Sequence, residues 1–427
     1  MQAPKLSFSR KAALAILAAT LLAPGWAIAQ REVALHNFGS GQDGNILYGG
    51  VISDSSGNLY GTTFAGGAYD NGLYGSGIVF ELSPQKDGTW SETVLHDFGA
   101  ATDGSGPTAG LVFDSVGNLY GTTQYGGGST FCQGGCGIVF QLRPPAVPGG
   151  AWTESIIYRF REVYRGDNPQ AGLIVDSAGN LYGTTFLGGN GGGTVFELLP
   201  KKGLWTERIL YAFVSNGSTG SSPNASLIMD SVGNLFSTTS QGGTYNAGTV
   251  FELSPQSNGS WQFKVLHSFN STAGDGSDPV GILILDSGGN LYGAAGEGGD
   301  HQLGAVFELT PSTGGSWTER VLYSFGASAT DGTFPEGGLL LDTTGNLFGE
   351  TEQGGSYGGG TLFELAPSNG TWTEHLLHNF GNSTDGKFPW GGLLFSPSGN
   401  IYGACAEGGV HYTDSDQGGT VFEVKTP

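Results

Sequence analysis

Short apolar runs separated by polar turn residues recur along the whole chain. In the sixth of seven similar units these runs are GGLLLD, NLFGET, GTLFEL and, after a polar loop, WTEHLLHNF. They are rich in branched and aromatic residues and are bounded by Gly, Pro, Asn or Ser, which is typical of β-strands. The pattern predicts four short strands per unit and an all-β fold.

The units follow a regular spacing. The motif D-x-x-G-N-[LI]-[YF], with Ser396 in place of the aspartate in the last copy, places its glycine at positions 57, 117, 179, 233, 289, 345 and 399. The spacings are 60, 62, 54, 56, 56 and 54 residues. A period of this size indicates a repeat architecture. Four-stranded units repeated four to eight times are typical of a β-propeller, and an open solenoid is the rival arrangement.

The two ends of the repeat array favour a closed ring. The last unit stops at GGTVFEVKTP, without a fourth strand, whereas REVALHNF at residues 31–38 is an isolated copy of that strand. We therefore expect the N-terminal strand to complete the last sheet of a seven-bladed β-propeller with four antiparallel strands per blade. The D-x-x-G-N hairpins would then lie on one face, and the crossings between blades and the variable GG loops on the other.

The repeat also resembles a known family. Units of the form GNLYGTT-x-x-GG…GTVFEL are similar to those of the GloVer tandem-repeat family of bacterial exported proteins, and they cover nearly all of the chain after residue 29. The resemblance implies a secreted or surface-attached protein that is propeller-like and has no established activity.

The first residues indicate export. Lys5, Arg10 and Lys11 precede a short apolar run, and Ala27 to Ala29 fit a cleavage site. The run is interrupted by Pro24 and is shorter than the roughly 20 residues that span a membrane. We predict a signal peptide over residues 1–29, a single propeller domain over 30–427 without a transmembrane segment, and a secreted or periplasmic location.

Charge and composition narrow the partners. Without the leader, 13 lysines and arginines face 37 acidic residues, a net charge of −24. Such a surface disfavours nucleic acids, and also acidic polysaccharides unless a divalent cation bridges them. We expect a monomer without a cofactor.

Three cysteines are present in this exported chain. Cys132 and Cys136 in TFCQGGCG are predicted to form a disulfide within one loop, which leaves Cys405 as a buried, unpaired residue.

Residues present in most units are explained by the scaffold. The aspartates that precede Gly-Asn are predicted to cap the hairpins. Six tryptophans open the fourth strands and are expected to wedge between outer strands: Trp90, Trp152, Trp205, Trp261, Trp317 and Trp372. His36, His96, His267 and His378 occupy a position where other units carry tyrosine, so we interpret them as packing residues.

Function is therefore sought where the copies differ. The residues before the GG loops are, in chain order, Ala65, Tyr125, Leu187, Gln241, Glu297, Gln353 and Glu407. The residues at the mouth of the innermost strands are Tyr48, Thr108, Gln170, Asn224, Val280, Glu336 and Trp390. His301 and His411 follow Glu297 and Glu407 by four positions.

These departures gather in the last three units. The sixth unit has Tyr357 and adds Glu350 and Glu352 where several other copies carry Thr, Phe or Ala and none carries an acidic residue. Closure of the ring should bring Tyr48 beside Trp390. We expect a patch of carboxylates, imidazoles and aromatic rings near the channel, where ligands bind on ring scaffolds. Drift of solvent-facing loops is the alternative explanation.

The patch fits a neutral extracellular glycan, which stacks on aromatic rings and hydrogen-bonds to carboxyl oxygens. The predicted ligand-binding residues are Trp390, Tyr48, Glu336, Tyr357, His301 and His411. The candidates for hydrolysis of a glycosidic bond are Glu297, Glu407, Glu350 and Glu352, because that chemistry needs one protonated and one ionised carboxyl group. An acidic face argues against a lyase that acts on uronates.

Two other interpretations stay open. Glu297, His301, Glu407 and His411 are ordinary zinc or manganese ligands, but no local ligand motif such as HExxH supports a metal site, and none is predicted. The alternative to a glycan-binding or hydrolytic protein is a non-catalytic interaction scaffold at the cell envelope.

Overall fold

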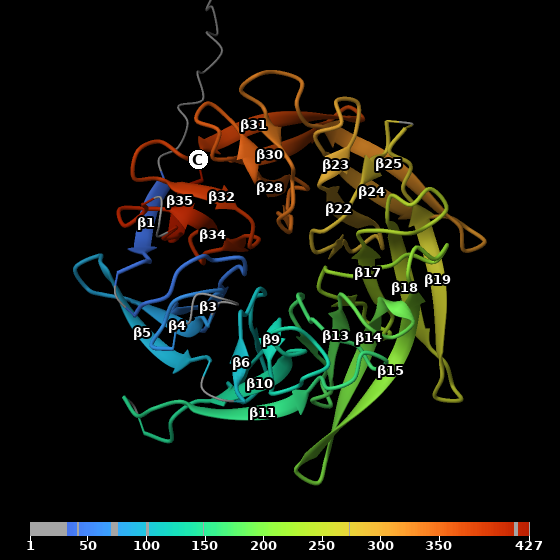
Figure 1. Cartoon of the computed structure of the whole chain (residues 1–427). Coiled ribbons are helices and arrows are strands. Elements are labelled where there is room, and N and C mark those ends of the chain that lie inside the picture. Colours follow the sequence, from blue (N-terminus) through green and yellow to red (C-terminus); the bar gives the residue numbers. More distant parts are fainter. Residues whose placement is uncertain are drawn as a thin grey trace, which may run out of the picture.

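The computed structural model describes residues 32–40, 42–69, 76–99, 102–147, 149–272, 274–413 and 417–426. These residues are all β, in seven antiparallel blades arranged in a ring, so the predicted seven-bladed β-propeller is confirmed (Figure 1). The predicted leader lies outside the described residues. Within them, no helix has the length and apolar character needed to cross a membrane.

Each blade has four strands, ordered from the channel outward. Blade 1 is β2 (Ile52–Ser53), β3 (Leu59–Thr63), β4 (Ile78–Pro84) and β5 (Trp90–Asp97). Blade 2 is β7 (Val112–Phe113), β8 (Leu119–Thr123), β10 (Ile138–Arg143) and β11 (Thr153–Arg159). Blade 3 is β12 (Ile174–Val175), β13 (Leu181–Thr185), β14 (Gly191–Lys201) and β15 (Leu204–Val214). Blade 4 is β16 (Ile228–Met229), β17 (Leu235–Thr239), β18 (Thr249–Pro255) and β19 (Trp261–Ser268).

The last three blades keep this order. Blade 5 is β21 (Ile284–Leu285), β22 (Leu291–Ala295), β24 (Ala305–Pro311) and β25 (Trp317–Ser324). Blade 6 is β27 (Leu340–Leu341), β28 (Leu347–Thr351), β30 (Thr361–Ser368) and β31 (Thr371–Asn379). Blade 7 is β33 (Leu394–Phe395), β34 (Ile401–Gly408), β35 (Thr420–Val424) and β1 (Glu32–Asn37).

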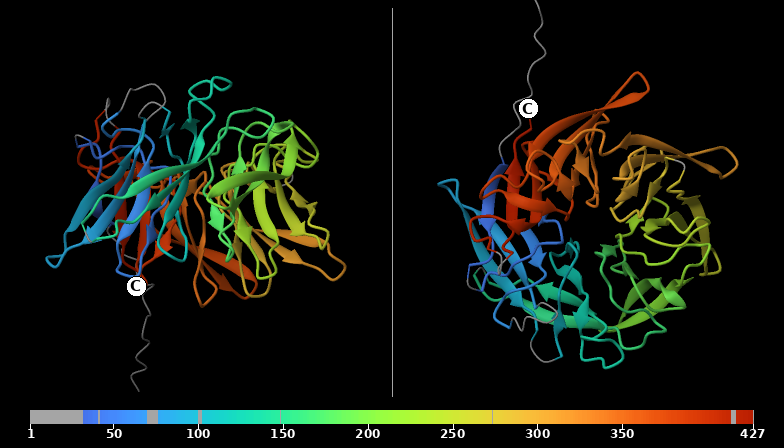
Figure 2. Two further views of the ribbon diagram at one scale, coloured as in Figure 1. Left: turned by 90° about the horizontal axis from the view of Figure 1, so that it is seen from below. Right: turned by 45° about the horizontal axis from the view of Figure 1, so that its top comes forward.

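The N-terminal strand closes the ring as predicted. β1 pairs antiparallel with β35, from Glu32 opposite Val424 to Asn37 opposite Thr420. The two strands lie side by side, blue against red, in Figure 1 and in the right-hand view of Figure 2. The seventh blade therefore takes its outermost strand from the other end of the chain.

The predicted division of loops between two faces is also confirmed. In three blades a two-residue strand in the crossing pairs with a two-residue strand at the GG loop. These pairs are β6 (Gly104–Ser105) with β9 (Tyr125–Gly126), β20 (Gly276–Ser277) with β23 (Glu297–Gly298), and β26 (Gly332–Thr333) with β29 (Gln353–Gly354). In blade 7, β32 (Gly386–Pro389) pairs with β34 in the same way. Crossings and GG loops thus share one face, which we call the crossing face.

Phenylalanine pairs form the core between blades. Phe38 on the closing strand packs on Phe80 of blade 1 with ring centroids 4.8 Å apart, and Phe98 packs on Phe140 at 5.0 Å. Gly61 is needed beneath these rings, because a Cβ there would lie 2.5 Å from the Phe80 ring. Burial of large aromatic surfaces at each blade interface is the main source of stability.

The hairpin aspartates have the predicted capping role, whereas the tryptophans pack differently from the prediction. Asp54 accepts hydrogen bonds from the N–H groups of Ser56 and Asn58, and Gly57 takes a φ of 85° in the same turn. The tryptophans bridge adjacent blades rather than outer strands alone: Trp152 packs edge-on against Tyr60 on the second strand of the preceding blade, at 6.1 Å.

The histidines on the fourth strands pack as predicted, and three of them, His96, His267 and His378, are also hydrogen-bonded to an aspartate of the following crossing. His96 meets Phe98 edge-on at 4.6 Å, and its Nε2 is hydrogen-bonded to Oδ2 of Asp103 at 3.0 Å. The contact between these histidines and the aspartate of the DG crossing cannot be predicted from the repeat pattern, because the two residues face each other only after the chain turns into the next blade.

Candidate functional site

A cavity of about 230 Å³ lies at the centre of the ring. Its lining includes one residue from the mouth of each innermost strand: Tyr48, Thr108, Gln170, Asn224, Val280, Glu336 and Trp390. The structure therefore brings together all seven positions that the sequence comparison aligned. Four of them, Thr108, Gln170, Asn224 and Val280, are neither charged nor aromatic. The other three are the aromatic residues Tyr48 and Trp390 and the acidic residue Glu336.

A repeated backbone feature precedes each of these residues. Two positions earlier in every blade the chain adopts a positive φ: Ile46, Gly106, Asn168, Ser222, Asp278, Phe334 and Phe388. Left-handed backbone is unfavourable for branched and aromatic residues. Ile46 is held by two backbone hydrogen bonds, from its N–H to Gly418 and from the N–H of Phe64 to its carbonyl. Because all blades share this turn, it is part of the scaffold that positions the cavity residues.

Closure of the ring places two aromatic residues together. The rings of Tyr48 and Trp390 lie 5.1 Å apart at an interplanar angle of 82°, and Tyr48 also meets Phe64 edge-on at 5.3 Å. Trp390 remains 36% exposed. The predicted juxtaposition of these two residues is thus present, and it places a partly exposed indole at the wall of the cavity.

Carboxyl groups from blades 5 to 7 gather beside this aromatic pair. Burial raises the pKa of Glu336 to about 8, and nearby carboxylates add to the effect. These neighbours are Glu352, Asp278 and Glu297. Burial also raises the pKa of Glu407, with a further contribution from Glu352. Like charges in a partly desolvated site disfavour ionisation, and among these groups Glu336, with a pKa of about 8, is protonated at neutral pH.

The tyrosine belongs to the same electrostatic group. Burial raises the pKa of Tyr48, and the Glu407 and Glu352 carboxylates add to this rise. The aromatic pair and the carboxyl groups are therefore neighbours in one site. We call Tyr48, Trp390, Glu336, Glu352 and Glu407 the channel-mouth cluster.

Two further residues contribute that sequence analysis did not select. Asp278 stands at the positive-φ position of blade 5, and burial with Glu297 nearby raises its pKa to about 6. Lys387 lies opposite Glu407 in the β32–β34 pair and partly offsets the rise in the pKa of Glu407. Its ammonium also lies 4.0 Å from the centre of the Tyr412 ring. Asp278 and Lys387 both lie in crossings between blades, so they could have been found only by aligning the variable crossing sequences of the seven units.

Glu350 lies apart from the cavity surface. It is 1% exposed, and burial raises its pKa to about 8, although the Gly392 amide partly offsets this. Neither carboxyl oxygen has a hydrogen-bond partner of good geometry. A Cβ on Gly337 or Gly403 would lie 3.1 or 2.9 Å from these oxygens, so the group fills the space between blades 6 and 7.

The remaining candidates lie on the outer loops of the crossing face. Tyr357 is 56% exposed, and His301 and His411 are exposed as well. None of the three is among the residues that line the central cavity. Nor do Glu297, His301, Glu407 and His411 form a group of closely spaced metal ligands in the part of the chain that the structure describes.

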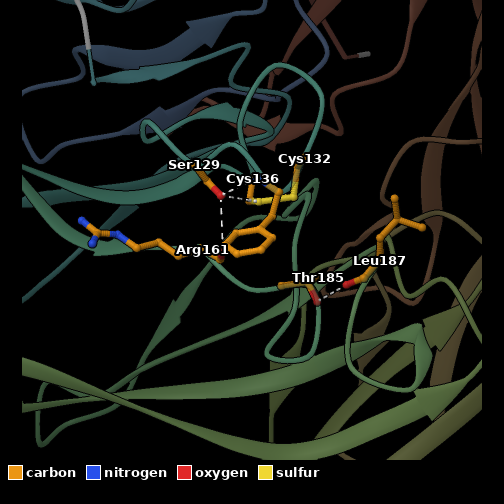
Figure 3. The surroundings of a disulfide bond; sticks show 7 residues. Ser129, Cys132, Cys136, Arg161, Thr185 and Leu187 are labelled. Carbon is orange, nitrogen blue, oxygen red and sulfur yellow. Dashed lines mark hydrogen bonds between the residues drawn. A yellow bond between two sulfur atoms is a disulfide. The ribbon is translucent and has the colours of Figure 1, made fainter.

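The cysteines adopt the expected states. Cys132 and Cys136 form a disulfide in the GG loop of blade 2, with their Cα atoms 5.1 Å apart (Figure 3). Ser129 joins this loop to the next segment, because its hydroxyl donates to the carbonyl of Arg161 at 3.3 Å. Cys405 is fully buried, and burial raises the pKa of its thiol, so it is not an accessible nucleophile.

Solved structures share the fold at low sequence identity. The chain matches the extracellular domain assigned to a one component system from B. thetaiotaomicron with a TM-score of 0.53 and 12% identity, over 93% of this chain and 40% of that one. It matches an ancestral GH74 enzyme with a TM-score of 0.56 and 12% identity, over 91% of this chain and 49% of that one. The chain thus spans less than half the length of either, and the likeness shows the fold alone.

Sequence comparison identifies the repeat itself. No curated protein matches the chain. The model of the Gloeobacter/Verrucomicrobia repeat matches residues 128–341 and 233–427, which together cover more than half of the sequence. The resemblance drawn from the repeated motifs is confirmed, and the chain belongs to the Gloeobacter/Verrucomicrobia repeat family.

Proposed function

We propose that this protein is an exported β-propeller that binds a neutral extracellular glycan at the channel-mouth cluster. The observation that carries the proposal is the Tyr48–Trp390 pair at the wall of the central cavity, which Glu336 also lines. Glu352 and Glu407 lie near enough to Tyr48 to raise its pKa. The predicted leader and the likeness to an extracellular domain support export.

The chemistry of the cluster matches an uncharged sugar. A pyranose ring presents an apolar face of C–H groups, which packs on the exposed indole of Trp390. Carboxylates accept hydrogen bonds from sugar hydroxyls, and a protonated Glu336 also donates one. An anionic ligand would be repelled by the same carboxyl groups.

The dimensions of the cavity limit what enters it. Sites for drug-sized ligands usually measure about 300–1,000 Å³, and this cavity measures about 230 Å³. We therefore infer that it accepts one sugar ring, such as the end of a longer chain, while the rest of the glycan lies over blades 5 to 7.

Hydrolysis is the catalytic form of this proposal. Glu336, with a pKa of about 8, is protonated at neutral pH and suits the role of general acid. Glu352 or Glu407 would supply the ionised carboxylate, as base or nucleophile. Glu350 is buried away from the ligand and would support the site without touching the reacting atoms.

A second surface favours the scaffold alternative. Phe131 is 71% exposed and Tyr164 is 81% exposed, both near the disulfide loop of blade 2 and the crossing to blade 3. Arg159 and Arg161 line the cavities on this side of the ring. Exposed aromatic and arginine side chains are enriched at protein interfaces.

A panel of neutral oligosaccharides separates these functions. Purified protein would be tested for binding by calorimetry and for release of reducing ends. Binding with turnover supports a hydrolase, and binding without turnover supports a lectin-like role. If no neutral glycan binds, the glycan proposal fails and the interaction scaffold is favoured.

A further inference from the structure

Far from the central cavity, an imidazole and two carboxyl groups meet where the ring closes. His378 lies on β31 of blade 6, Asp385 on the crossing to blade 7, and Glu32 on the closing strand β1. One potential ligand atom from each residue lies within 4.8 Å of the others. His378 Nε2 is 3.0 Å from Asp385 Oδ2 and 3.8 Å from Glu32 Oε2.

We propose that Glu32, His378 and Asp385 bind one divalent transition-metal ion, with Zn²⁺ the best match, and that this ion fastens the closing strand to blade 6. Imidazole nitrogen and carboxylate oxygen are ordinary Zn²⁺ ligands, at distances of about 2.0–2.2 Å. In tetrahedral geometry such ligand atoms lie about 3.3–3.4 Å apart. The two separations from His378 Nε2, 3.0 and 3.8 Å, bracket this spacing.

The state of Glu32 points to a missing partner. The residue is 7% exposed, and its Oε1 is buried without a hydrogen-bond partner. Its Oε2 accepts a hydrogen bond from the N–H of Gly386 at 3.2 Å, which holds the carboxyl group in place. A buried carboxyl oxygen without a partner is costly, and a bound cation would remove this cost.

The site is also accessible. A cavity of about 420 Å³ adjoins the cluster and is lined by its three donors together with residues 382–384. It has room for an ion and for water in the fourth coordination position. A usable site needs such an entry path, besides suitable ligands and distances.

Another blade interface provides a natural comparison. Between blades 5 and 6 the equivalent residues are Tyr323, Asp331 and Glu374, with tyrosine in place of histidine. Tyr323 donates hydrogen bonds to Asp331 at 3.3 Å and to Glu374 at 3.4 Å. This scaffold therefore accepts tyrosine at the histidine position, where the phenol supplies hydrogen bonds in place of an imidazole ligand.

The test uses the full chain after removal of metal with EDTA. Zn²⁺ is titrated by calorimetry, and the Tm is measured with and without Zn²⁺. We expect wild type to bind Zn²⁺ with a saturable rise in Tm. His378→Tyr and Glu32→Gln should weaken the tightest binding at least about 100-fold, beyond the 10–100-fold typical of outer-shell changes. Glu374→Gln should leave it unchanged.

His378→Tyr keeps the test decisive if Glu32→Gln fails to fold, since tyrosine already occupies the equivalent place in blade 5. Equal Zn²⁺ binding by wild type and His378→Tyr would place the ion elsewhere, at the surface or at the similar groups around His96 and His267, and overturn the proposal. So would a wild-type Tm that Zn²⁺ does not raise, or one that rises with Ca²⁺ alone.

Discussion

Glu350 stands at a residue position where four other blades carry a threonine. In those blades the hydroxyl donates to a carbonyl of the next blade, as Thr62 does to Ala109 at 3.0 Å. Glu350 cannot reproduce this bond while ionised, and both of its oxygens are buried without good partners. The residue therefore departs from the repeat at a cost to stability, which is expected near a functional site.

This cost predicts the effect of restoring the repeat. Glu350→Thr should raise the free energy of unfolding by about 1–3 kcal/mol, the usual penalty of an unsatisfied buried group. The gain should be larger at pH 9 than at pH 6, because Glu350 has a pKa of about 8 and its ionisation destabilises the fold. Denaturant unfolding at both pH values measures this. A destabilised variant would show instead that the carboxyl group makes favourable interactions in the folded protein.

The sequence predicted part of the site at this scale. Departures from the repeat identified Tyr48, Trp390 and Glu336, which do meet at the cavity. The same criterion also selected Tyr357 and His301, which lie on exposed outer loops. A repeat shows which positions vary, but the direction of a loop side chain depends on backbone geometry that the pattern does not contain.

At the scale of the element, β1 could be predicted because the fourth strands of all units have similar sequences. Its pairing with β35 followed from a missing fourth strand, and its register follows from the apolar pattern. The DG crossings were harder to predict, because they pair with GG loops across only two residues. Their left-handed turns have no shared residue type: Ile46, Asn168 and Phe334 all adopt them.

Removal of the closing strand should destabilise the whole ring. Deletion of residues 32–37 exposes the edge of β35 and its apolar face, so the Tm should fall by many degrees and the protein should self-associate. Replacement of these residues by the equivalent sequence of β5, ETVLHD, should preserve closure, since the blade pattern is kept. Calorimetry and light scattering report both effects. A deletion that stays monomeric with the wild-type Tm would contradict the closed ring.

At the scale of the whole molecule, stability depends on seven similar blade interfaces. Four interfaces contain a glutamate whose pKa burial raises to about 7: Glu92, Glu154, Glu319 and Glu374. The repeat pattern did not predict that these carboxyl groups would face an aspartate and either a histidine or, for Glu374, a tyrosine of the preceding blade. That arrangement depends on how far neighbouring blades are rotated.

These glutamates make stability depend on pH. An unfolded glutamate has a pKa near 4.5, so between about pH 4.5 and 7 the folded chain retains protons that the unfolded chain releases. The raised pKa of His96 acts in the same direction. In EDTA, the Tm should therefore fall by several degrees between pH 5.5 and pH 8. Substitution of Glu154 and Glu319 by glutamine should flatten this dependence, whereas a Tm that rises over this range would contradict the assignment.

Binding of a neutral glycan at the channel-mouth cluster is tested most directly at Trp390. The measurement is calorimetric titration of Trp390→Ala with an oligosaccharide that wild type binds. Loss of stacking should weaken binding by about 1–3 kcal/mol, a size comparable to base–aromatic stacking. Tyr164→Ala, which removes an 81% exposed ring elsewhere, should bind as wild type does. Unchanged affinity in a folded Trp390→Ala protein would contradict glycan binding by this cluster and place the glycan site outside it.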